Sequence, residues 1–241
     1  MALATHEFIN GLFSLIFVSV SVLVSLIIIS KFFKYRDKNL LLVGFSWLII
    51  CEPWWPVAIS FLLILLTGEG LPQDIYLLIG FVLLPVGLET WLIAFTNMKY
   101  KEKQKTIIGI FTIPAILYEF LFFYFFFTDI AMLGVLQGPV DVKYGIFIIV
   151  IAIYILSVLL ITGIIFARES LKSDNSEIRL KGKFLFAAFT SYVIGTFLSM
   201  FSSYSILLLM IGRILTILAS IEFYYGFTLP NWIKKLLLKQ E

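Results

Sequence analysis

The sequence predicts an all-α membrane protein, a bundle of seven transmembrane helices. Three observations lead to this fold class. Of the 241 residues, 61% are hydrophobic and only 14% are charged, whereas about a quarter of the residues in a soluble domain are charged. Apolar runs of about 20 residues or more, enough for a helix to cross a bilayer, recur along the whole chain. The basic residues gather in alternate connections between these runs.

The apolar runs divide the chain into seven spans separated by charged or turn-forming segments. The least distinct boundary is the polar break at 200–205, which divides about 45 apolar residues, a length sufficient for two spans. We expect residues 1–229 to form one transmembrane domain and residues 230–241 to form a cytoplasmic tail. The predicted spans are residues 8–33, 40–66, 73–98, 106–127, 143–168, 183–203 and 205–229.

The charge distribution predicts the orientation of these spans. Sixteen of the 18 Lys and Arg residues lie in the first, third and fifth connections or in the tail. Because basic connections stay on the cytoplasmic side, the sequence predicts a multi-pass protein of the cell membrane with its N-terminus outside and its C-terminus inside. The remaining connections carry Glu69, Asp74, Asp129 and Asp141, with Lys143 as their basic residue.

The chain leaves the last span through the segment Tyr225-Gly-Phe-Thr-Leu-Pro-Asn-Trp-Ile-Lys234. After Pro230, apolar and basic residues take opposite faces of a predicted helix, which is typical of an amphipathic helix at a membrane interface. The seven-span layout and this exit resemble the seven-helix sensory modules of prokaryotic histidine kinases and of their archaeal relatives. The resemblance implies ligand sensing, with output through a separate signalling or assembly partner on the inner side.

Four ionisable residues from four different spans fall at similar predicted depths, about 14 to 21 Å from the inner ends of their helices. An ionised carboxylate at this depth is costly unless it is paired, protonated or bound to a cation. We expect Arg213 to neutralise one or two of the acids, and Tyr118 and Tyr192 to donate hydrogen bonds to this layer. The four residues are Glu52, Glu89, Glu119 and Arg213.

Two interpretations of this charged layer are open. One arginine does not neutralise three glutamates, which favours a binding site for a ligand or an ion. The alternative is a salt-bridge network that only fixes how the helices pack.

Prolines and tryptophans beside the charged layer predict a cavity. The prolines interrupt their helices and free backbone carbonyls, which neighbouring groups or water must satisfy. The tryptophans do not lie at the headgroup level, where membrane tryptophans usually gather. We therefore expect a pocket that opens outward, and its predicted lining is Pro53, Trp54, Trp55, Pro56 and Trp91.

The longest outer connection, residues 128–142, contains an apolar stretch at 131–136. Such a loop either folds back over the mouth of the bundle or rests at the membrane interface. Of the two arrangements, we expect the loop that rests at the interface.

The inventory of reactive residues argues against an enzyme. His6 is the single histidine and lies near the N-terminus, and Cys51 is the single cysteine, so a Ser–His site or a cysteine zinc cluster is not expected. No Asp lies deep within a span, and the last span has no Lys for a retinal Schiff base. We expect no cofactor, no metal site and no nucleic-acid partner.

Three functions remain compatible with the sequence. The first is a receptor-like sensor that binds a small molecule or lipid at the charged layer. The second is a proton- or cation-coupled transporter or channel that uses the same acids. The third is a structural subunit of a membrane assembly.

Overall fold

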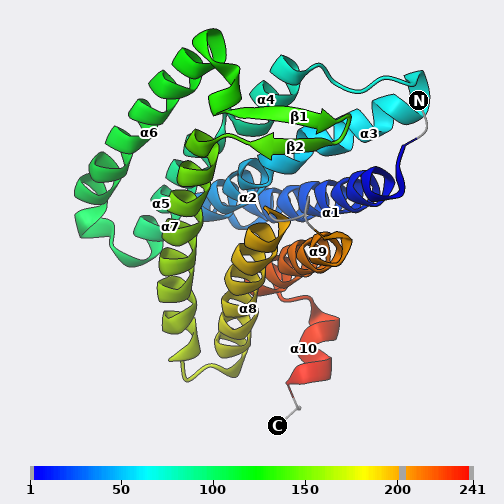
Figure 1. Cartoon of the computed structure of the whole chain (residues 1–241). Helices are drawn as coiled ribbons and strands as arrows, with labels where there is room; N and C mark the ends of the chain where they lie inside the picture. The colour runs from blue at the N-terminus through cyan, green and yellow to red at the C-terminus, as the bar shows by residue number, and fades with distance from the viewer. Residues whose placement is uncertain (1–2, 201–204, 239–241) are drawn as a thin grey trace.

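The computed structural model describes residues 3–200 and 205–238 and is predominantly helical (Figure 1). Seven helical segments in these residues are long and apolar enough to cross a membrane, which confirms the prediction of a helical multi-pass membrane protein. The segments are Thr5–Tyr35, Lys38–Thr67, Gln73–Lys99, Lys101–Thr128, Ile146–Leu171, Ser176–Ser199 and Ile206–Thr228. Residues 201–204 of the predicted break at 200–205, and the tail residue Lys239, lie outside the described residues.

Five of these segments contain a single α-helix each, and the second and third are broken near their middles. The unbroken helices are α1 (Thr5–Tyr35), α6 (Gln104–Thr128, after the short helix η2, Lys101–Lys103), α7 (Ile146–Leu171), α8 (Ser176–Ser199) and α9 (Ile206–Thr228). The broken segments consist of α2 (Lys38–Ile50), η1 (Glu52–Trp54) and α3 (Trp55–Thr67), then α4 (Gln73–Phe81) and α5 (Leu84–Lys99). A short helix, α10 (Asn231–Leu237), follows Pro230.

Both breaks coincide with prolines. Pro53 lies in η1, Pro56 near the start of α3, and Pro85 near the start of α5. A proline lacks the N–H that would continue the helix ladder, so helices end before it and restart at it. Pro114 differs, because α6 continues through it.

The apolar connection after α6 folds back onto the bundle as a β-hairpin. After η3 (Ile130–Met132), strand β1 (Gly134–Gly138) pairs antiparallel with β2 (Asp141–Tyr144). The hairpin is held by two hydrogen bonds: the Asn10 side chain donates to the Val140 carbonyl at 2.8 Å, and the Leu136 N–H donates to Gln73 Oε1 at 3.1 Å. The expected arrangement, a loop resting at the interface, is therefore wrong: the structure shows the loop folded over one end of the bundle, because it pairs as a hairpin and is hydrogen-bonded to α1 and α4.

Helix packing is closest between α8 and α9, whereas α6 lies at the edge of the bundle and packs mainly along α5 (Figure 1). Gly195 of α8 and Gly212 of α9 allow the two backbones to meet. A Cβ atom added at Gly195 would lie 2.8 Å from the Gly212 carbonyl oxygen, a distance that real Cβ contacts essentially never show.

Gly195→Ala should therefore lower the free energy of unfolding by about 1–3 kcal/mol, because the added methyl group pushes α8 away from α9. The measurement is chemical unfolding in detergent micelles. Gly109→Ala in α6 is the matched control, since no atom lies within 4 Å of its added Cβ. Equal stability of the Gly195→Ala variant and the wild type would contradict the close packing of α8 on α9.

Candidate functional site

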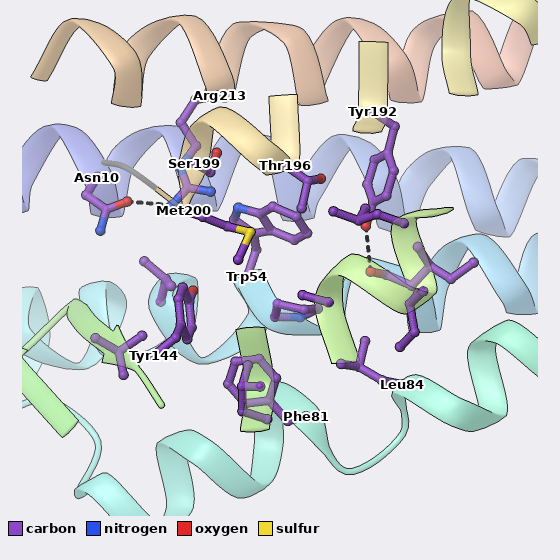
Figure 2. Close-up of a pocket in the computed structure, with 18 of the residues that line it drawn as sticks. Asn10, Trp54, Phe81, Leu84, Tyr144, Tyr192, Thr196, Ser199, Met200 and Arg213 are labelled. Carbon is purple, nitrogen blue, oxygen red and sulfur yellow. Dashed lines mark hydrogen bonds between the residues drawn. The ribbon is translucent and has the colours of Figure 1, made fainter. Parts of the chain in front are cut away.

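A cavity of about 80 Å³ lies inside the bundle, beneath the β-hairpin (Figure 2). Its walls come from α1, the broken segments, β2, α7, α8 and α9, so segments far apart in the sequence meet around it. Most of the lining is apolar or aromatic, with a few polar groups among it. This composition is typical of small-molecule sites. The polar and aromatic groups of the lining include Asn10, Trp54, Tyr76, Phe81, Asp141, Tyr144, Tyr192 and Arg213.

Arg213 is the central polar group of this cavity. Its side chain comes from α9 toward Asn10 and Trp54 (Figure 2), and the residue is only 5% exposed. Nη2 donates a hydrogen bond of 2.7 Å to Asn10 Oδ1, and the guanidinium carbon lies 5.7 Å from the centre of the Trp54 ring. Nε and Nη1 have no hydrogen-bond partner among the described residues.

Arg213 and Asn10 lie inside the bundle because each is on the buried face of its helix. Arg213 lies on the buried face of α9, together with Leu209 and Thr216 at helical spacing. Asn10 begins a buried polar stripe on α1 that continues through Ser14 and Ser21. Further along, Ser21 and Ser220 share a hydrogen bond of 2.9 Å, which fixes α1 against α9.

Three further polar groups lie around the guanidinium. Tyr76 is 1% exposed, and its hydroxyl has no hydrogen-bond partner within residues 3–200 and 205–238. Tyr144 of the hairpin packs edge-on against Phe81, with ring centres 5.7 Å apart. Asp141, also in the hairpin, is half-buried, and this burial raises its pKa although the nearby charges of His6 and Arg213 act in the opposite direction.

The predicted layer of acids is not gathered around Arg213. In the described part of the chain, no carboxylate oxygen lies within the 4.0 Å of an ion pair with this guanidinium. Glu89 lines a different crevice, between α5, α6 and α7, and Glu119 lines neither of these two spaces. Equal depth in the membrane does not determine the direction in which a helix face points, so residues of one layer can face different surroundings.

Glu52 has a clear structural partner. It is fully buried, and its two carboxyl oxygens lie 2.9 and 3.0 Å from the backbone nitrogen of Leu83, whose N–H donates to them. Leu83 stands between α4 and α5, where the helix ladder is interrupted. The carboxyl group of Glu52 therefore satisfies a backbone donor that the break exposes.

The two predicted tyrosines satisfy backbone acceptors at the same breaks. The Tyr118 hydroxyl donates to the carbonyl of Phe81 at 2.7 Å, and Pro85, four residues later, has no N–H to offer that carbonyl. The Tyr192 hydroxyl donates to the carbonyl of Ile50 at 2.8 Å, at the end of α2. Both tyrosines are hydrogen-bond donors as expected, but their acceptors are carbonyl groups rather than glutamates.

The predicted pocket lining is only partly brought together. Pro53 and Trp54 line the cavity. Trp91 lies elsewhere in the core and donates from Nε1 to Thr162 Oγ1 at 2.8 Å. Trp55 and Pro56 do not line the cavity, and Pro56 packs against Gly80.

Sequence reasoning missed Asn10, Tyr76, Asp141 and Tyr144. Asn10 carried a signal, because it lies one helical turn before Ser14 in an otherwise apolar helix. Asp141 and Tyr144 carried none, since only the folded hairpin brings them to the cavity.

Comparisons of the chain with family models, curated proteins and solved structures found no match. Within residues 3–200 and 205–238, no three His, Cys, Asp or Glu side chains are grouped so that they could hold a metal ion. The chemistry of the Arg213 cavity is therefore the basis for a proposed function.

Two substitutions test whether Glu52 acts as the hydrogen-bond acceptor for the Leu83 N–H or as part of a binding site. Glu52→Leu should be less stable than Glu52→Gln by about 1–3 kcal/mol, because Gln keeps an acceptor for the Leu83 N–H and Leu does not. The measurement is chemical unfolding in detergent. The control pair is Glu119→Leu and Glu119→Gln, which should not differ in this way. Equal stability of the two Glu52 variants would contradict the backbone-capping role.

Proposed function

We propose that this protein is a receptor-like sensor of the cell membrane that binds a small organic anion at Arg213. The observation that carries the proposal is a buried guanidinium with two nitrogens lacking a partner among the described residues, next to a cavity. Arginine stays protonated in proteins, so this positive charge cannot be removed by proton loss. Burying it without a counter-charge is costly, and an anion in the cavity would supply that charge.

The chemistry around Arg213 favours a carboxylate with a small apolar or aromatic body. The planar guanidinium matches a carboxylate through two parallel hydrogen bonds, and the unpartnered Tyr76 hydroxyl offers a third donor. The rings of Trp54 and Phe81 supply apolar surface for the rest of the molecule. A volume of about 80 Å³ suits a small acid, because a single buried water needs about 10–15 Å³ on the same scale.

The proposed orientation places the hairpin and this cavity toward the outside and the lysine-rich end inside. The charge distribution supports it. At the lysine-rich end, Lys99 Nζ lies 2.6 Å from Glu169 Oε1, and Lys234 of α10 pairs with Glu177. A ligand that contacts α9, α1 and the broken segments together would favour one arrangement of these helices, and a partner inside would detect the change.

In a proton- or cation-coupled transporter, the buried acids would form the ion site. In the structure, both oxygens of Glu52 face the Leu83 N–H, which leaves this carboxylate less able to coordinate a cation. The sensor is therefore the function that the geometry supports best.

Carboxylic acids should stabilise the wild type against thermal unfolding, and their neutral amides should not. At a ligand concentration of 100 Kd, the expected gain is about 2.7 kcal/mol. Arg213→Met should abolish the gain, while Arg213→Lys, which keeps the charge but not the planar fork, should retain a weaker one. The measurement is a thermal-shift series in detergent with acetate, butyrate and benzoate.

Glu89→Gln is the matched control for that series and should respond to the acids like the wild type. Equal stabilisation by acids and amides, or a normal response of Arg213→Met, would contradict the anion site. Uptake of the same acids into liposomes would favour the transporter over the sensor.

Asp141→Asn should strengthen acid binding by about threefold to tenfold, because it removes the negative charge near the bound anion. Wild-type binding should weaken as the pH rises through the pKa of Asp141, which lies above its usual range, since the ionised carboxylate repels the ligand. Titration calorimetry between pH 5 and pH 8 measures the affinity of the wild type and of Asp141→Asn for the acid. An identical pH dependence of the two affinities would refute the effect of Asp141.

A further inference from the structure

A second space, a crevice of about 260 Å³, lies between α5, α6 and α7. It forms because α6 diverges from the rest of the bundle (Figure 1). Its walls are apolar and aromatic, and they include Leu88, Pro114, Tyr118, Phe147 and Tyr154. The crevice and the Arg213 cavity share Ile155 but are otherwise lined by different residues.

Glu89 is the charged residue in the described lining of this crevice. Its Oε1 atom is buried and has no hydrogen-bond partner among the described residues. Thr112 and Tyr154 are its polar neighbours, and neither carries a positive charge. The carboxyl group therefore faces an apolar space without a countercharge in the described part of the chain.

Aromatic rings line the same crevice as this carboxyl group. Phe111 and Tyr118 come from α6, and Phe147 and Tyr154 come from α7. The faces of aromatic rings attract cations, most strongly where water is excluded. A carboxylate among several rings is the arrangement that recognises amines and quaternary ammonium groups.

The mouth of the crevice faces the surroundings of the bundle rather than its interior. Leu117 of α6 and Val150 of α7 line it and are 55% and 56% exposed. Nearby on α6, Ile113 and Phe120 are 70% and 68% exposed, an apolar surface suited to lipid chains. A ligand would therefore reach the crevice from within the bilayer.

We propose that this crevice binds a cationic amphiphile, with its ammonium group against Glu89 and its apolar chain between α6 and α7. The proposal for this site does not rest on the anion site at Arg213, because the recognised charge is opposite and different polar residues carry it. If one site does not bind its ligand, the observations that support the other site are unchanged.

The test uses a dodecyl chain that carries a photoreactive diazirine and ends in trimethylammonium. The neutral probe is the same chain ending in a tert-butyl group, which has the same shape without the charge. Purified full-length protein in nanodiscs of uncharged glycolipid is photolabelled with each probe, and the adducts are mapped by mass spectrometry. Wild-type protein should carry the cationic adduct on α5, α6 or α7, at least tenfold more than the neutral adduct.

Three variants complete the experiment. Glu89→Gln should reduce cationic labelling at least tenfold, and Glu119→Gln, which removes an acid of α6 outside the crevice, should leave it unchanged. Ala115→Trp fills the crevice and should reduce labelling by both probes. Equal labelling of the wild type by the two probes overturns the proposal without relying on any variant. Adducts scattered over other helices, or normal labelling of Glu89→Gln, also overturn it.

Discussion

The structure depends on satisfying backbone hydrogen-bonding groups where two transmembrane segments are interrupted. In hydrocarbon no water can solvate a free N–H or carbonyl, so each interruption needs partners from within the protein. Glu52 accepts from the N–H of Leu83, and Tyr118 and Tyr192 donate to the carbonyls of Phe81 and Ile50. These contacts join α2 to α8, α4 to α6 and η1 to the α4–α5 break. The hydrogen bonds at the interruptions thus connect different helices of the bundle.

The interruptions also make room for the Arg213 cavity. Pro53 and Trp54 of η1 and Phe81 at the end of α4 line it, and the hairpin covers it at the end where Asn10 lies. A straight pair of helices would present continuous side-chain ridges at this level, and they would pack against α9. Arg213 instead faces a space with a carboxamide, a tryptophan face and two phenols. These groups are the basis of the proposed anion site.

The two internal spaces differ in their chemistry and in their access. The Arg213 cavity contains a buried cation and lies under the hairpin, whereas the crevice at Glu89 contains a buried acid and opens between α6 and α7. Ile155 of α7 contributes to both. A shift of α7 would change both spaces, which offers a physical route by which binding in one could alter the other.

Composition and the spacing of charges by themselves determined the class of the protein. Seven apolar runs can only become seven helices in a membrane, because a helix satisfies its own backbone there. The prolines likewise placed the two interruptions. The positions of Tyr118 and Tyr192 within the spans predicted that they donate hydrogen bonds, although the expected acceptors were the glutamates and not backbone carbonyls. The partners of these groups were decided by the tertiary structure. Helix rotation turns Glu52 to a backbone N–H and Asn10 toward Arg213, and the fold of the hairpin brings Asp141 near Arg213. Neither helix rotation nor hairpin packing follows from the depth of a residue along its helix.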